Sequence, residues 1–197
     1  MDIKIECAEP GMAPQIASLI MEAMNHECCQ NFAGTHHTLA DFHRMMTMLV
    51  KMEDSQYSYR NTLVAIAPDG SVAGICVAYD GGMLHTLRRR FVEAARQAFG
   101  IDYSGMDDET AAGEYYVDSL CVDKNFRGMG IATRLLKAAI GRGRDMGIPA
   151  VGLLVDKGNP KAEKLYHRLG FEYAGDTVWG GHEMKHLLYI QALDRIL

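Results

Sequence analysis

The sequence predicts an α/β fold of the α+β type with one central mixed β-sheet, and two stretches of the chain indicate it. Residues 115–155 have the pattern of a strand, a helix with apolar residues at a 3.6-residue spacing, and a second, almost wholly apolar strand. Such a unit pairs its two strands in parallel, with a right-handed crossover. Residues 61–67 and 71–79 are apolar runs joined by Pro68-Asp69-Gly70, a turn signal between antiparallel strands. The sheet is therefore expected to contain both kinds of pairing.

The other predicted elements surround this sheet. We expect a first strand at 3–8, a helix with the apolar stripe Ile16, Leu19, Ile20 and Ala23, helices at 39–52 and 83–99, and strands at 171–178 and 182–189. Another helix begins at Asn159, a good cap that is followed by Pro160, and ends at Gly170. No linker, repeat or low-complexity tract interrupts the chain, so residues 1–197 are predicted to form a single domain.

Composition narrows the class of function. A chain of 197 residues with 48% hydrophobic and 23% charged residues can fill one globular core. Its net charge of −5 argues against binding to nucleic acid, which needs a basic stripe, and suits a cationic small substrate. The five cysteines are odd in number and irregularly spaced, which favours buried thiols in a reducing compartment. Without an apolar run of membrane-spanning length or a signal pattern, we expect no membrane partner and a cytoplasmic location.

Three polar segments allow more than one interpretation. Residues 25–37 contain two cysteines and three histidines but lack the regular spacing of a structural zinc site, so we expect a polar loop with the ends of the flanking helices, and no metal. Arg88 to Arg90, in the helix at 83–99, are placed mostly on its solvated face. The segment 101–113 is acidic and has no Lys or Arg, which fits either a pocket for an amine or a solvated loop.

The turn between the strand at 115–122 and the following helix predicts a phosphate-binding site. Gly128 and Gly130 precede a helix that begins near Ile131. The first turn of a helix has backbone N–H groups without intrahelical acceptors, and the helix dipole adds partial positive charge there. Glycines also let a pyrophosphate approach the main chain without meeting a Cβ. We therefore expect a cofactor that carries a pyrophosphate group to bind at this turn.

Two motifs support this expectation. The first is Arg-x-x-Gly-x-Ala at Arg127, Gly130 and Ala132, after a strand that ends in S-L-C-V. The second is N-P-K-A-E-K-L-Y-H-R-L-G-F at 159–171, which matches the pattern Asn-x-x-Ala-x-x-Leu-Tyr-x-x-x-Gly-Phe. With both motifs in order and a strand between them, the chain resembles the GNAT superfamily of acyl-CoA N-acyltransferases. The close match covers about 115–173.

The resemblance implies a GNAT-like fold, with flanking helices and two central parallel strands that splay apart around acetyl-CoA. The strand backbone would meet the pantetheine arm, the amides of the turn would hold the pyrophosphate, and Tyr166 would lie near the sulfur. Asn159 and Tyr166 also fit structural roles, as a helix cap and as part of an apolar stripe. By position, the resemblance assigns cofactor binding to Leu120, Cys121, Val122, Arg127, Gly128, Met129, Gly130, Ile131, Ala132, Thr133, Asn159, Ala162 and Tyr166.

Acetylation of an amine requires a base, because only the neutral amine attacks a thioester carbonyl. Asp118 is our first candidate, since it lies on the strand that leads to the cofactor, although alternate strand residues face opposite sides. Glu114 is the second candidate, and His182 and Glu183 are more distant ones. A water chain is a further alternative.

The leaving thiolate requires an acid, and the phenol of Tyr166 is the candidate for this catalytic role. An amide in the segment 120–122 is placed to stabilise the developing oxyanion. Cys121 has no His or Asp beside it in the sequence, which favours direct transfer over an acylated cysteine.

The sequence thus predicts an N-acetyltransferase that moves an acetyl group from acetyl-CoA to the primary amine of a small molecule. An insertion at about 80–114 is expected to shape the acceptor site. A dinucleotide-binding fold is disfavoured because Thr133 stands where the third glycine belongs. A non-catalytic acyl-CoA-sensing domain and a protein or peptide N-acetyltransferase stay open as alternatives. The resemblance is also compatible with a homodimer.

Overall fold

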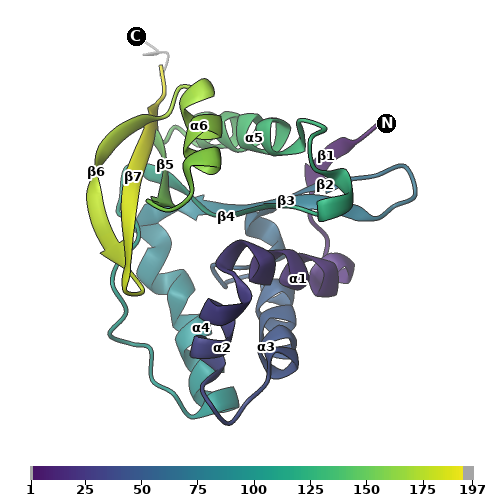
Figure 1. Cartoon of the computed structure of the whole chain (residues 1–197), viewed down its shortest axis with the longest axis vertical. Coiled ribbons are helices and arrows are strands. Elements are labelled where there is room, and N and C mark those ends of the chain that lie inside the picture. Colours follow the sequence, from purple (N-terminus) through teal and green to yellow (C-terminus); the bar gives the residue numbers. More distant parts are fainter. Residues whose placement is uncertain (1, 193–197) are drawn as a thin grey trace.

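The structure is a computed structural model that describes residues 2–192, and in it seven strands form one mixed sheet (Figure 1). The strands β1 (Lys4–Cys7), β2 (Thr62–Ile66), β3 (Val72–Asp80) and β4 (Glu114–Val122) follow one another in antiparallel pairs. β4 then pairs in parallel with β5 (Ala150–Asp156), and β7 (His182–Ile190) and β6 (Glu172–Trp179) extend the sheet antiparallel. The predicted mixed α/β class is confirmed.

Helices cover the two faces of the sheet as separate layers (Figure 1). One face carries α1 (Ala13–Met24), α2 (His26–Ala33), α3 (Leu39–Lys51) and α4 (Leu84–Phe99), and the other carries α5 (Ile131–Asp145) and α6 (Pro160–Arg168). Each layer has its own buried core, with Phe42 and Phe91 in the first and Leu135 and Phe171 in the second. β3 is buried along nearly its whole length because both layers cover it.

Local signals in the sequence account for where several elements begin. The Thr38 hydroxyl accepts a hydrogen bond from the Asp41 amide at 3.2 Å, and the Asp41 carboxylate accepts one from the Thr38 amide at 2.8 Å, a capping box that starts α3. The Asn159 side chain caps α6 in the predicted way. Short 3-10 turns lie at Pro10–Met12, Tyr59–Asn61, Gly81–Met83 and Lys124–Phe126.

The prediction of a polar loop at 25–37 is wrong, because most of this segment forms α2. The Asn25 side chain caps the helix by accepting a hydrogen bond from the Cys28 amide at 2.8 Å. Cys29 and Ala33, four residues apart, are buried against the first core. Only one narrow side of this short helix is apolar, so its period is hard to recognise in the sequence.

The two central parallel strands separate part-way along their length, as the resemblance implied. β4 and β5 pair over only four residues each, from Glu114 with Ala150 to Val117 with Leu153. β4 continues to Val122 and β5 continues to Asp156, without pairing with each other. The backbone edges of these two strand ends are therefore open to a ligand between them.

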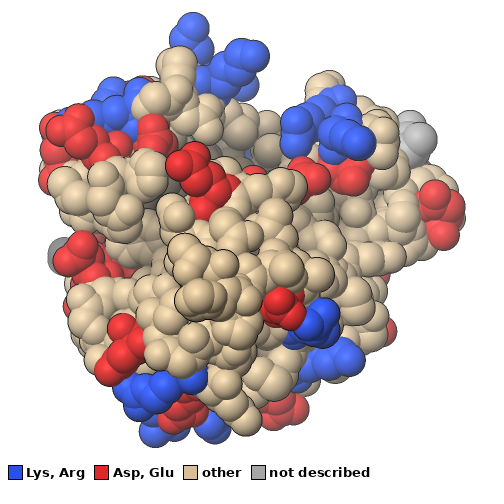
Figure 2. Space-filling view, turned by 60° about the horizontal axis from the view of Figure 1, so that its bottom comes forward, with Lys and Arg blue, Asp and Glu red and all other residues tan. Residues whose placement is uncertain are grey.

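The surface carries its charges in small mixed groups. In Figure 2, Lys and Arg side chains stand near the edges of the visible face, interspersed with Asp and Glu, around a broad area of uncharged residues. Among residues 2–192, no helix is both long enough and apolar enough to cross a membrane.

Candidate active site

The end of β4 and the start of α5 form an open cradle for a phosphate group. Gly128 and Gly130 have φ angles of +80° and +74°, in the left-handed region that glycine adopts without strain. A Cβ at either position would meet no atom within 4 Å, so the space above both glycines is free. No side chain of the described residues caps α5, and its first N–H groups stay available. The cradle therefore fits a pyrophosphate at a helix N-terminus.

A cavity of about 750 Å³ leads from this cradle into the gap between β4 and β5. Leu120, Cys121 and Val122 line one wall of it, and Leu154, Val155 and Asp156 line the opposite wall. The cavity also reaches α6, the buried acid Glu109 and the half-buried acid Asp118. Its size is typical of a small-molecule site, and it joins the cradle to a group of ionisable side chains.

Asp118 projects into this cavity from a β-bulge. Val77 of β3 pairs with Ser119 and Ala78 pairs with Val117, so Asp118 has no partner residue on β3. A bulge turns one side chain away from the strict alternation of a strand, and this removes the uncertainty about the direction of Asp118. The bulge lies where the pairing of β4 with β5 ends, which is the point at which the cavity opens.

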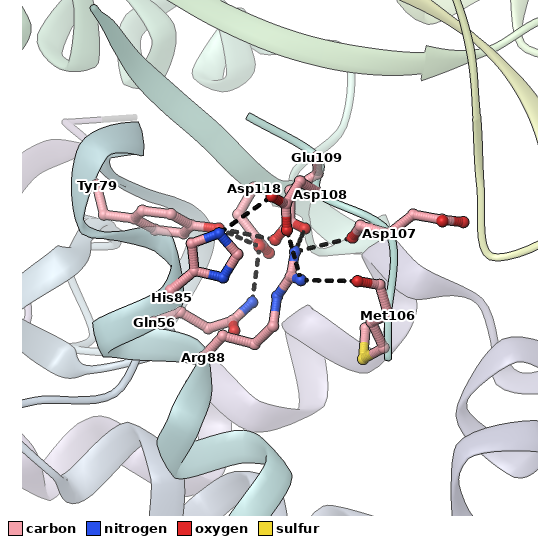
Figure 3. A network of polar contacts seen from close by, with 9 residues as sticks. All are labelled: Gln56, Tyr79, His85, Arg88, Met106, Asp107, Asp108, Glu109 and Asp118. Carbon is pink, nitrogen blue, oxygen red and sulfur yellow. Dashed lines mark hydrogen bonds and ion pairs between the residues drawn. The ribbon is translucent and has the colours of Figure 1, made fainter. Parts of the chain in front are cut away.

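The surroundings of Asp118 prepare it to exchange a proton near neutral pH. Its Oδ1 accepts a hydrogen bond from the Ser119 hydroxyl at 2.8 Å, and its Oδ2 accepts a longer one from Gln56 Nε2 at 3.3 Å. The Tyr79 hydroxyl stands 3.4 Å from the same Oδ2 and makes its shorter hydrogen bond, of 2.9 Å, to Glu109 Oε1 (Figure 3). Burial and the neighbouring carboxylate of Glu109 raise its pKa to about 7, and these hydrogen bonds only partly oppose the shift. Such a pKa suits a general base at physiological pH.

Glu109 is a second acid in the cavity, and a buried arginine holds it in place. The Arg88 guanidinium pairs with Glu109 and, at 3.0 Å, with Asp108. It also donates hydrogen bonds to the carbonyls of Met106 at 3.2 Å and Asp107 at 2.9 Å (Figure 3). Arg88 and Glu109 are each only 6% exposed, so the guanidinium and the carboxylate compensate one another away from solvent.

The prediction that Arg88 lies on the solvated face of its helix is therefore wrong. The buried side of α4 is formed by residues that lie four, three and four positions apart: Leu84, Arg88, Phe91 and Ala95. This spacing was visible in the sequence, as was an acidic segment without a cation of its own. Together, these two signals could have indicated that Arg88 turns inward to compensate the acids.

Comparisons with known proteins agree with this geometry. The family model described as Acetyltransferase (GNAT) family matches residues 41–171, about two thirds of the chain. The chain belongs to the GNAT acetyltransferase family. Members of this family use acetyl-CoA as the acetyl donor, which fits the cradle and the gap between β4 and β5.

Individual relatives of this GNAT chain are more distant. The mycothiol acetyltransferase of Thermobifida fusca (strain YX) is 38% identical over 80 residues, which are 40% of this chain and 24% of that protein. The chain thus spans about a quarter of the length of this curated relative. A solved structure described as an acetyltransferase superposes with a TM-score of 0.80 at 26% identity, covering 95% of this chain and 98% of the other. The N-acetyltransferase from Staphylococcus aureus Mu50 shares the fold, with a TM-score of 0.78 at 22% identity over 94% of this chain and 100% of that one.

The structure brings most of the predicted site residues of this GNAT chain to one cavity. The cavity is lined by Asp118, Leu120, Cys121, Val122, Arg127, Gly128, Ala132, Asn159, Ala162 and Tyr166. Of the other predicted cofactor contacts, Ile131 has its side chain buried in the second core and Met129 is exposed. The cavity lining does not include four of the predicted residues: Met129, Gly130, Ile131 and Thr133. Their contribution to cofactor binding could come only from the backbone of the turn and of the first turn of α5.

Glu114 lies apart from this group. Its Oε2 accepts a hydrogen bond from the Thr110 hydroxyl at 3.2 Å and stands 3.1 Å from His186 Nε2. It faces Gly152, where an added Cβ would overlap the carboxylate. Glu114 does not line the cavity, whereas Glu109, which the sequence did not single out, does.

The Tyr166 phenol and the Cys121 thiol both face the cavity in their protonated forms. Burial raises the pKa of Tyr166 to about 12, and its ring packs edge-on against Phe171. Burial and the nearby Glu22 raise the pKa of Cys121 to about 12 as well. A thiol in this environment is a poor nucleophile.

The described residues offer no cluster for a metal ion. Across residues 2–192, no three His, Cys, Asp or Glu side chains converge as metal ligands.

Proposed function

We propose that the chain is an N-acetyltransferase that transfers an acetyl group from acetyl-CoA to the primary amine of a small molecule by direct attack. One observation carries the proposal: Asp118, Tyr166 and the phosphate cradle open into the same cavity, at the end of the gap between β4 and β5. A base, an acid and a cofactor site are thus within reach of one another, as an acyl transfer requires.

The cofactor site would be built from backbone groups. The N–H groups of the first turn of α5, beside Gly128 and Gly130, would hold the pyrophosphate. The unpaired edge of β4 at Leu120 to Val122 would bind the amide groups of the pantetheine arm as an adjacent strand would. Bound acetyl-CoA supplies a thioester carbonyl as the electrophile.

Asp118 would act as the general base. The acceptor arrives as an ammonium ion, which the carboxylate of Asp118 attracts into the cavity. Asp118 Oδ2 takes the proton, and the neutral nitrogen is then able to attack. Because its pKa is about 7, Asp118 is largely ionised above neutral pH and still basic enough to accept a proton.

Tyr166 would act as the general acid. Its pKa of about 12 keeps a proton on the hydroxyl throughout the physiological range, ready for the sulfur that leaves when the C–S bond breaks. A backbone N–H of β4 at 120–122 would stabilise the negative charge that develops on the carbonyl oxygen. Cys121 is not needed in this sequence of steps, and its protonated thiol is consistent with direct transfer.

The test is acetyl-CoA-dependent thiol release across small amines, peptides and proteins, with blanks that lack the acceptor to correct for the five cysteines of the chain. We expect turnover with small primary amines and a loss of turnover in Asp118→Asn. Turnover only with peptides or proteins would replace the small-molecule acceptor by a macromolecular one. Binding of acetyl-CoA without turnover of any acceptor would instead indicate a sensing domain.

A further inference from the structure

A second cavity, of about 290 Å³, adjoins the main one at its acceptor end. It lies between α2, the segment 101–113 and the turn that joins β6 to β7. Cys28, Trp179 and His182 line both cavities, so the two spaces are neighbours. We refer to the second space as the side cavity.

Three aromatic rings, of Phe32, Tyr103 and Trp179, line the side cavity. Phe32 packs edge-on against Tyr103, with ring centroids 5.1 Å apart, and lies 6.4 Å from the ring of Trp179. The Tyr103 hydroxyl donates a hydrogen bond to the Phe32 carbonyl at 3.0 Å, so its polar end already has a partner. Met106 adds a flexible apolar wall. This lining suits a compact aromatic group better than a polar one.

The acidic side chains that are shielded from solvent lie in the main cavity. Within residues 2–192, no Lys or Arg lines the side cavity, and the one carboxylate of its lining, Asp107, is exposed. The buried carboxylate of Glu109 and the Asp118 side chain line the main cavity instead. A ligand that spans both spaces would therefore meet negative charge at one end and aromatic rings at the other.

We propose that the side cavity is an acceptor subsite for the aryl group of an arylalkylamine, whose primary amine lies at Asp118. The inference rests on the proposed function, since it assigns the acceptor of the same reaction. Only Asp108 separates Asp107 of the side cavity from Glu109 of the main cavity, so a spacer of a few methylene groups connects the two positions. A polyamine would find only the exposed carboxylate of Asp107 for its second ammonium, and the three aromatic rings suit an aryl group better than a sugar.

Binding can be measured without catalysis, because Trp179 is the single tryptophan of the chain. Titration with 2-phenylethylamine should change Trp179 fluorescence saturably, and ethylamine, spermidine and glucosamine should do so only at concentrations about ten-fold higher or more. The same order should hold in kcat/KM for acetyl transfer. Equal responses to 2-phenylethylamine and ethylamine, or a preference for spermidine or glucosamine, would overturn the subsite.

Variants at β6 separate the subsite from a general effect on the fold. We expect Trp179→Ala to lower kcat/KM for 2-phenylethylamine about ten-fold while leaving ethylamine within about two-fold, and Trp179→Phe to restore much of the loss. Tyr173→Ala removes an exposed aromatic ring from the same strand, outside both cavities, and should change neither substrate. Equal losses for both amines in Trp179→Ala would contradict the assignment.

The two proposals fail in distinguishable ways. A fluorescence response to 2-phenylethylamine without any acetyl transfer would keep the subsite and refute the transferase activity on small amines. Transfer to small amines without the aryl preference would support the transferase activity and refute the aryl subsite.

Discussion

In the proposed mechanism, Asp118 links the activity of the protein to its stability. Its pKa is raised from 3.8 to about 7, so between these values the folded protein keeps a proton that the unfolded chain has released. The folded state is thereby favoured at low pH, and this contribution is progressively lost as the pH rises towards 7. The burial that raises the pKa of Asp118 therefore also makes its ionised form unfavourable in the folded protein.

Replacing Asp118 by Asn should therefore stabilise the protein and inactivate it. We expect the gain in unfolding free energy over the parent to be larger at about pH 8 than at about pH 5, by on the order of 2 kcal/mol, and kcat/KM to fall about 100-fold or more. Urea denaturation at both pH values and thiol-release kinetics measure the two effects. Asp145→Asn, an exposed acid at the end of α5, is the control. A gain that does not depend on pH would contradict the raised pKa.

The wild-type pH profile provides a second readout of the same group. As Asp118 ionises, kcat/KM should rise with pH and show a limb with an apparent pKa of about 7. In Asp118→Asn this limb should be absent, whereas any limb caused by titration of the amine substrate should remain. A limb that survives the substitution would assign the base to another group.

Tyr166 allows a separate test of the acid. Tyr166→Phe keeps the ring that packs on Phe171 and removes the hydroxyl, so we expect kcat to fall about 10- to 100-fold with little change in the Kd of acetyl-CoA. Tyr189 packs on the same Phe171 and does not line the cavity, which makes Tyr189→Phe a matched control. Steady-state kinetics and calorimetric titration measure the two quantities. Unchanged turnover in Tyr166→Phe would exclude the phenol as the acid.

At the scale of elements, Arg88 connects α4 to the acidic segment 101–113. This one guanidinium contacts two acidic side chains and two carbonyls of the segment. It thereby fixes Glu109 in the main cavity and Met106 and Asp107 beside the side cavity. The position of both cavities thus depends on a contact between α4 and a segment without regular secondary structure.

Replacing Arg88 by Met should destabilise the protein and weaken acceptor binding. Loss of the cation leaves Glu109 buried without a partner, a change that costs about 3–5 kcal/mol. KM for the amine should increase more than KM for acetyl-CoA, because the phosphate cradle lies on α5. Thermal unfolding and steady-state kinetics test this, with the exposed neighbour Arg89→Met as the control. Adding Glu109→Gln to Arg88→Met should recover part of the lost stability, because it removes the unpaired buried charge. A double variant that is no more stable than Arg88→Met would contradict the pairing of Arg88 with Glu109.

The two halves of the site differ in how far the sequence predicts them. The cofactor half follows from local signals: the glycines before α5, the Asn159 cap and the apolar period of α5 are all read within a few residues. The acceptor half depends on contacts between distant segments, such as Gln56 with Asp118 and Arg88 with Glu109. The direction of Asp118 depends on a bulge, which a strand pattern does not reveal.

For the molecule as a whole, the separation of β4 from β5 divides the sheet into two parts. Four paired residues on each strand join β1–β4 to β5–β7, and beyond them the cavity replaces the hydrogen bonds of a continuous sheet. A ligand in this gap would complete the backbone hydrogen bonds of both strand ends. Acetyl-CoA is in this sense expected to act as a structural bridge as well as a substrate.

This bridging predicts that CoA stabilises the protein more than its nucleotide part does. At about 100 times its Kd, CoA should add about 2.7 kcal/mol and raise Tm by roughly 5–10 °C. It should also slow amide exchange at 118–122 and 154–156. Adenosine 3′,5′-bisphosphate, which lacks the pantetheine arm, should protect the first turn of α5 and leave the strand ends as they are in the free protein. Calorimetry at equal concentrations of the two ligands compares the stabilisation, and hydrogen exchange at equal fractional saturation compares which segments are protected. If the nucleotide protects the strand ends as well as CoA does, the pantetheine arm does not lie between β4 and β5.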